Sequence, residues 1–281
     1  MSKQTAFDKL DLLGVEIDAL GTSEAIDYIC DLAAPKHPAA YVIKPYVEFL
    51  DRAYHDPQLQ DLLNQADLAI ADGVALLWAA AYLYAGKRSG ERFWLTLAQI
   101  IVAPDRLRWP LPDRAGGISF TWPLLEAAAN HGLRVYLIGK EEADDIAAVT
   151  RRITSQLPRL NIVGTQIGRD SDSPYGSVSD DWLDRITVLL RDAKPDLVLV
   201  GMGFPLQERV SAALASRLDH GVFVGEGGTF DYDSFGGPKR KAPAWMQRTG
   251  LEWAWRLILE PRRIMRQLAI PRCIWRIWRS R

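Results

Sequence analysis

The sequence predicts an α/β fold built around a parallel, doubly wound sheet. Short apolar runs typical of strands alternate along the chain with longer segments typical of helices, which is the pattern of parallel sheets. Leu197–Val200 is a continuous apolar run, as expected of a strand that is covered on both faces. Gly201 and Gly203 follow at once, where the chain must turn or let a ligand approach the backbone.

Length and composition are those of a globular protein with a sizeable core. The chain has 281 residues, of which 48% are hydrophobic, enough for one large domain or two smaller ones. The N-terminus lacks the apolar core of a signal peptide, and the most membrane-like stretch, Phe93–Pro104, is too short to span a bilayer. Two distant cysteines, Cys30 and Cys273, imply no disulfide framework. We therefore expect a cytoplasmic protein.

The first third of the chain holds three expected strands and four expected helices. Thr22 or Ser23 is a suitable cap for the first helix, and Asp72-Gly73 is a turn that places Asp72 at the carboxyl end of a strand. The expected strands are Val15–Ile17, Tyr41–Ile43 and Leu68–Ala71. The first expected helix ends near Leu32, and the other three are Val47–Tyr54, Pro57–Gln65 and Val74–Tyr84.

Residues 86–115 interrupt the alternation of strands and helices. An apolar centre, Phe93–Val102, is flanked by basic residues on both sides. The segment is either an amphipathic insertion at a membrane surface or an extra helix packed on the core.

The alternation then resumes. Gly225–Gly228 is a glycine-rich turn that contains Glu226, and a domain boundary is expected near Gly236–Pro238, which divides the chain into residues 1–237 and a basic helical appendage, residues 238–281. The helices expected here are Trp122–Asn130, Ala143–Gln156, Asp180–Arg191 and one from about Pro205 to Leu218, and the strands are Arg134–Ile138, Asn161–Thr165, Leu197–Val200 and Val222–Val224.

Gln207 and Glu208 lie in the first turn of the helix that follows Leu197–Val200. In an open parallel sheet, ligands bind beyond the carboxyl ends of the strands. The two side chains are therefore placed to contact a small molecule, although solvated polar residues in an ordinary turn would have the same spacing.

The C-terminal segment is strongly basic although the whole chain has a net charge of −1. Residues 239–281 hold twelve Lys/Arg, two acids and five of the ten tryptophans. Basic residues interleaved with Trp suit an anionic membrane surface, because Trp favours the headgroup layer and Arg attracts anionic lipids. A nucleic acid is the competing partner.

Two other motifs are weaker. Gly139-Lys140 follows a strand but lacks the patterns of phosphate-binding and dinucleotide-binding loops. Asp231 and Asp233 have the spacing of a metal-binding Asp-x-Asp pair, yet few other ligands are near, so we expect neither a metal nor a cofactor.

Several longer motifs resemble the WecG/TagA/CpsF family of bacterial glycosyltransferases, which act in the assembly of teichoic acid, enterobacterial common antigen and exopolysaccharide. The long C-terminal signature is the most specific of them, and together the motifs extend over most of residues 10–266. They are Ala66-Asp67-Leu68 with Asp72-Gly73, Arg134–Gly139, Pro195-Asp196, Gly201–Glu208, Gly225–Asp231, Lys239-Arg240, Ala242–Met246, Gly250–Leu257 and Glu260–Arg263.

The resemblance implies a Rossmann-like, metal-independent inverting transferase. Such an enzyme moves a hexosamine-type sugar from a UDP donor to a polyprenyl-diphosphate-linked sugar, at the inner face of the membrane, as a peripheral protein that can form oligomers. Asp72 matches the family's base, which takes the proton of the acceptor hydroxyl. The expected substrate-binding positions are Lys44, Tyr46, Gly73, Gly139, Gly201, Gly203, Gln207, Glu208, Gly227 and Asp231, with Arg256, Arg262 and Arg263 of the appendage.

The chain departs from the family pattern at several of these positions. Lys44 and Tyr46 stand where the family has a Thr-x-Asn pair, and Ser119 stands where it has a carboxylate. Lys44 would supply positive charge to a diphosphate. A divergent, non-catalytic protein that binds a sugar nucleotide or a lipid is the alternative, and an oxidoreductase is disfavoured because the dinucleotide fingerprint is missing.

Overall fold

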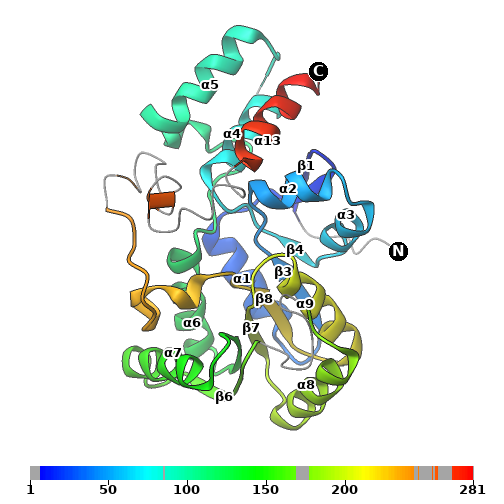
Figure 1. Cartoon of the computed structure of the whole chain (residues 1–281), viewed down its shortest axis with the longest axis vertical. Helices are drawn as coiled ribbons and strands as arrows, with labels where there is room; N and C mark the ends of the chain where they lie inside the picture. The colour runs from blue at the N-terminus through cyan, green and yellow to red at the C-terminus, as the bar shows by residue number, and fades with distance from the viewer. Residues whose placement is uncertain are drawn as a thin grey trace.

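The computed structural model contains a parallel sheet with helices on both faces (Figure 1). It describes residues 7–84, 86–168, 177–243, 246, 255, 257–258 and 268–280. The predicted α/β, Rossmann-like class is therefore confirmed.

The main sheet has six strands in the order β4-β3-β8-β7-β5-β6, and all neighbouring pairs are parallel. The two central strands, β7 and β8, are buried along nearly their whole length, which explains their unbroken apolar sequences. Because all six strands run the same way, their carboxyl ends meet at one edge of the sheet. The strands are β3 (Ala40–Ile43), β4 (Leu68–Ala69), β5 (Arg134–Gly139), β6 (Asn161–Gln166), β7 (Leu197–Gly201) and β8 (Val222–Gly225).

Side chains alternate between the two faces of each strand and build a separate hydrophobic core on each side. In β7, Leu197 and Leu199 join one core, and Val198 and Val200 join the other. The first core is completed by α1 (Thr22–Leu32), α6 (Gly117–Asn130) and α7 (Ala143–Gln156). The second is completed by α2 (Val47–Ala53), α3 (Pro57–Asn64), α4 (Val74–Tyr84), α8 (Asp180–Ala193) and α9 (Leu206–Arg217).

An N-terminal hairpin lies outside the main sheet. The expected strand at Val15–Ile17 exists as β2 (Val15–Asp18), but it pairs antiparallel with β1 (Lys9–Leu12), which was not predicted. Leu13 and Gly14 adopt positive φ in the tight turn between them. The Asp18 carboxylate accepts a hydrogen bond from the Ala69 N–H at 2.8 Å, and this contact attaches the hairpin to β4.

Residues 86–115 contain an extra helix packed on the rest of the molecule, which was one of the two predictions for this segment. It holds α5 (Gly90–Val102), which Ser89 caps through its side chain, and the short helix η1 (Pro104–Leu107). Phe93 packs edge-on against Trp78 and Tyr82 of α4. Figure 1 shows α5 projecting from the end of the molecule that is remote from β6.

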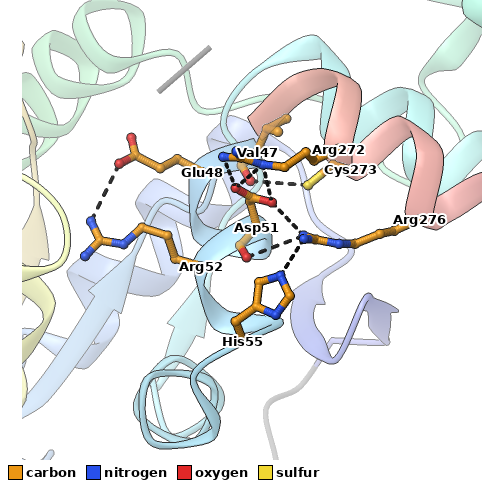
Figure 2. Close-up of polar contacts among 8 residues, drawn as sticks. All are labelled: Val47, Glu48, Asp51, Arg52, His55, Arg272, Cys273 and Arg276. Atoms are coloured by element: carbon orange, nitrogen blue, oxygen red, sulfur yellow. Dashed lines mark hydrogen bonds and ion pairs between the residues drawn. The ribbon is translucent and has the colours of Figure 1, made fainter. Parts of the chain in front are cut away.

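The described end of the appendage is an amphipathic helix, α13 (Ala269–Arg279). Ala269, Cys273 and Ile277 recur at four-residue spacing and are buried in the core that contains α2 and α4. Arg272 and Arg276 each contact the Asp51 carboxylate at 2.6 Å (Figure 2). The C-terminal helix is thereby held on α2, more than 200 residues away in sequence. No helix among the described residues combines the length and the apolar character needed to cross a bilayer.

Candidate functional site

A buried ion pair joins the carboxyl ends of two neighbouring strands. Lys44 follows β3 and Glu226 follows β8, and the Lys44 Nζ lies 2.7 Å from Glu226 Oε2. The side chains are 5% and 0% exposed, and Thr121 of α6 donates its hydroxyl hydrogen to the same Glu226 oxygen. Lys44 also lies 5.0 Å from the centre of the Phe120 ring. Burying these two charges is tolerable because they compensate each other.

This pairing changes the interpretation of Lys44. The sequence suggested an amine that faces a diphosphate, whereas the structure shows that Glu226 balances its charge. Direct contact with a diphosphate stays a prediction that requires the pair to open. Tyr46 lies on the same loop, donates its hydroxyl hydrogen to Glu48 at 3.0 Å, and packs its ring against Phe49 and Phe204.

Gln207 connects the loops that follow β7 and β8. Its Oε1 accepts hydrogen bonds from the backbone N–H groups of Gly203 at 3.2 Å and Gly227 at 2.8 Å. Its Nε2 donates to Glu208 Oε1 at 2.8 Å, and both side chains are buried. Gln207 therefore fixes the shape of the two loops at the edge where a ligand would approach.

The carboxyl group of Glu208 has a raised pKa. Burial raises the pKa of its carboxyl group to about 8, against the smaller lowering effect of the hydrogen bond from Gln207. Its Oε2 has no hydrogen-bond partner among the described residues. At neutral pH Glu208 is thus largely a neutral acid that can donate a hydrogen bond.

The predicted glycines serve two different purposes. Gly73, Gly203 and Gly227 have φ of +90°, +76° and +56°, and no described atom lies within 4 Å of a Cβ added at any of them. These three positions combine a backbone shape that favours glycine with open space beside the strand ends. Gly139 and Gly201 instead pack tightly, because a Cβ at either would come within 3.1 Å of the Phe230 ring.

Asp72 lies in the loop after β4, beside the loop after β3. Its N–H donates to the Pro45 carbonyl oxygen at 2.7 Å, and the Ala115 N–H donates to the Ala71 carbonyl oxygen at 2.8 Å. The first contact brings Asp72 to the Lys44 loop, and the second brings in the start of α6. Asp72 is half-buried and the open position at Gly73 follows it.

Asp231 ends η2 (Thr229–Asp231), the short helix after β8, and its carboxylate pairs with two lysines. Lys140, which follows β5, and Lys239 each contact one oxygen of its carboxylate at 2.8 Å. Burial alone would raise the pKa of Asp231, but these two hydrogen bonds outweigh it and hold the pKa below its usual value. Asp233 begins the next short helix, η3 (Asp233–Phe235), and is exposed. Within the described ranges, no group of three or more His, Cys, Asp or Glu side chains is arranged to hold a metal ion.

The structure brings together the residues that follow β3, β4, β5, β7 and β8. Sequence reasoning missed Thr121. It noted Lys140 only as part of a weak Gly-Lys motif, Lys239 only as part of the family signature and Glu226 only as part of a turn. The signal for Glu226 was its position directly after a buried strand, like Lys44. Arg256, Arg262 and Arg263 lie outside the described residues.

A hollow in the protein surface lies away from the strand ends and is less suited to chemistry. It has a volume of about 380 Å³ and is open to solvent beside the junction of α2 and α13. None of the residues that follow the strands lines it, and Asp51 already binds both Arg272 and Arg276 (Figure 2). We therefore assign the candidate site to the strand ends. The hollow is lined by Asp51, Arg52, His55, Asp56, Leu59, Arg272 and Arg276.

Comparison with known proteins identifies a family and relatives with similar sequences. The sequence model of the glycosyl transferase WecG/TagA/CpsF family matches residues 10–97 and 98–281, so the two matched pieces meet inside α5. A protein of Bacillus subtilis (strain 168) is 28% identical over 84% of this chain and 87% of its own length. A protein of Staphylococcus aureus (strain NCTC 8325 / PS 47) is 23% identical over 97% of this chain and 93% of its own. Both are named N-acetylglucosaminyldiphosphoundecaprenol N-acetyl-beta-D-mannosaminyltransferase.

Proposed function

This chain belongs to the WecG/TagA/CpsF glycosyltransferase family, and from that membership we propose that it transfers an N-acetylmannosamine-like sugar from a UDP donor to a polyprenyl-diphosphate-linked sugar. The transfer inverts the anomeric configuration and serves the synthesis of a cell-surface polysaccharide. The names of the two relatives support the sugar class and the lipid-linked acceptor. One observation carries the proposal: Asp72 follows β4 at the same edge of the sheet as the open glycine positions Gly73, Gly203 and Gly227, which follow β4, β7 and β8.

Asp72 is the general base in this proposal. The acceptor hydroxyl oxygen attacks the anomeric carbon of the donor, its proton passes to the Asp72 carboxylate, and the bond between the sugar and the diphosphate breaks. A positioned base of this kind typically contributes a factor of about 10² to 10⁴ in rate. The position of Asp72 supports the role, since its loop is fixed to Pro45 by a backbone hydrogen bond and the residue is only partly buried.

The UDP leaving group occupies the loops after β7 and β8. The open positions at Gly203 and Gly227 let a phosphate come close to the backbone of these loops, while the N–H groups of the two glycines themselves donate to Gln207. Arg256, Arg262 and Arg263 supply positive charge from the appendage, and no metal ion is required. Because Gln207 binds both loops, its substitution would alter donor binding through their shape.

The chain acts as a peripheral protein on the inner face of the cell membrane. A lipid-linked acceptor brings the reaction to the bilayer, and the basic, Trp-rich residues 239–281 favour an anionic surface.

Transfer is tested with purified full-length protein, a UDP-N-acetylhexosamine panel and a short-chain polyprenyl-diphosphate-GlcNAc acceptor. We expect release of UDP together with a disaccharide product, and proton NMR should show that the anomeric configuration of the transferred sugar is inverted. Turnover should persist in excess EDTA. Product formation that disappears on chelation and returns with Mg²⁺ or Mn²⁺ would contradict the metal-free mechanism, and binding of UDP-sugars without any transfer would favour the non-catalytic alternative.

A further inference from the structure

The outward surface of α5 is apolar, although it faces solvent. Trp94 is 68% exposed, Leu95 59% and Val102 82%, and Ala98 between them is also exposed. Trp94, Ala98 and Val102 recur at four-residue spacing and therefore form one stripe along the helix. On the inward side of α5, Phe93 packs on α4, and Leu97 and Ile100 are partly buried against the same core. A helix that is apolar on both sides is normally enclosed by other groups.

Two further tryptophans on segments near α5 are also exposed. Trp109, shortly after η1, is 61% exposed, and Trp275 on α13 is 53% exposed. Arg88 donates to the Ser280 carbonyl oxygen at 2.6 Å, and the rings of Phe93 and Trp278 lie 6.1 Å apart. Figure 1 shows α5 and α13 at the same end of the molecule. We define the α5 face as Trp94, Leu95, Ala98, Val102 and Trp109.

Basic residues flank the α5 face along the chain. Residues 93–104 include no charged residue, whereas the segments on both sides of them do. Residues 86–115 hold six Lys/Arg and three acids. The exposed basic residues around the face are Lys87, Arg88, Arg106, Arg108 and Arg279. An apolar, Trp-containing centre with a basic border is complementary to the headgroup layer of an anionic bilayer.

We propose that the α5 face inserts into the headgroup and upper acyl layer of an anionic membrane, as an anchor separate from the basic appendage. This inference extends the proposed function, since the acceptor there is lipid-linked, but binding to vesicles is measurable without turnover. Helix α4 connects Asp72 directly to the α5 segment. Its eleven residues, at about 1.5 Å each, give α4 a length of roughly 16 Å between the loop of Asp72 and the start of the α5 segment.

The first test uses flotation of full-length protein with phosphatidylcholine vesicles and with vesicles that contain phosphatidylglycerol. A triple variant, Trp94→Ser, Leu95→Ser and Val102→Ser, should bind phosphatidylglycerol vesicles at least about tenfold more weakly, and the binding that remains should vanish at high salt. The matched control is Val188→Ser with Leu189→Ser, because both residues are exposed apolar groups on α8, at the other end of the molecule. Binding of the control should equal that of the wild type.

A second measurement keeps the inference testable if the triple variant folds poorly. Ala98→Cys is labelled with an environment-sensitive dye, with Leu189→Cys as the control, and the native thiols Cys30 and Cys273 stay unlabelled because they are buried. Vesicles should shift the emission of the Ala98 probe to the blue and leave the Leu189 probe unchanged. Wild-type binding by the triple variant, or an Ala98 probe that stays in water on vesicle-bound protein, would overturn the inference. So would a self-association that the triple variant abolishes while vesicle binding persists, because the face would then join two copies of the chain.

Turnover on a water-soluble acceptor separates this inference from the proposed function. The triple variant should retain that turnover, since the α5 face touches none of the residues at the strand ends. Absence of transfer in the wild type and in every variant would reject the proposed function and leave the vesicle result intact.

Discussion

Glu226 is held at the centre of the strand edge by Lys44 and by the Thr121 hydroxyl, almost without contact with water. Its second oxygen, Oε1, has no hydrogen-bond partner among the described residues. A buried carboxylate of this kind depends on its cationic partner, because an uncompensated buried charge is strongly unfavourable.

Removal of the partner should therefore be more damaging than removal of both charges. Lys44→Met should lower the free energy of unfolding by about 3 kcal/mol or more, since Glu226 would remain buried and unpaired. The double variant Lys44→Met with Glu226→Gln should recover part of that loss. Urea denaturation measures each value, and Lys9→Met, which breaks the exposed Lys9–Glu16 pair, is the control that should lose less than about 1 kcal/mol. A double variant as unstable as the sum of its two singles would show that the pair does not act as a unit.

Glu208 makes a prediction about pH. Its folded-state pKa of about 8 lies above the ordinary value, so between about pH 5 and pH 8 the folded protein keeps a proton that the unfolded chain has lost. The folded state therefore binds more protons, and stability must fall as the pH rises through this window. Glu208→Gln mimics the neutral acid and removes the effect. The melting temperature of the wild type should fall relative to this variant from pH 5 to pH 8 and then level off; a constant difference across that range would contradict the raised pKa.

For single residues, the most useful signal for predicting the candidate site was a position directly after a strand. It singled out Asp72, Gln207 and Glu208, because the carboxyl ends of parallel strands share one edge. Partnerships could not be predicted in the same way: Lys44 and Glu226 are 182 residues apart, and nothing in local spacing shows that their strands are neighbours. The lysine partners of Asp231 were missed for the same reason.

At the scale of elements, the contact between α2 and α13 is a specific junction. Asp51 accepts hydrogen bonds from both Arg272 and Arg276, and Cys273 is buried between them and the core (Figure 2). Burial raises the pKa of the Cys273 thiol to about 12, so the thiol is unreactive while α13 is docked.

Asp51→Asn should loosen this junction, because it removes the charge that two arginines share. In a Cys30→Ser background, Cys273 should then react with an aromatic disulfide reagent at least about tenfold faster, through more frequent local opening of α13. Asp184→Asn, which weakens an exposed pair with Arg217, provides the comparison and should leave the rate unchanged. Equal rates in all three proteins would mean that apolar packing alone docks the helix.

Element existence was more predictable than element boundaries. The helices after each strand were expected because capping residues and apolar spacing mark them. α6 begins at Gly117 rather than at Trp122 and contains Pro123 in its second turn, where proline cannot donate the usual helix hydrogen bond. β1 was missed although Lys9–Leu12 alternates polar and apolar residues, because four residues give too short a pattern without their partner strand.

For the whole molecule, the order of strands could not be deduced from the sequence. Alternating strands and helices predict a parallel sheet, but they do not say that β8 lies between β3 and β7. That arrangement follows from long-range packing of two cores, and it decides which loops meet. It places the loops carrying Asp72, Lys44, Gly203 and Gly227 at one edge.

The central claim is that this edge transfers a sugar with Asp72 as the base, and the most direct measurement compares Asp72→Asn with the wild type. Turnover and UDP affinity are measured together, with Asp184→Asn as an exposed control on α8. The account predicts that Asp72→Asn keeps its fold and its affinity for UDP but loses a factor of about 100 or more in turnover, since only proton removal is lost. Wild-type turnover in a folded Asp72→Asn protein would contradict it.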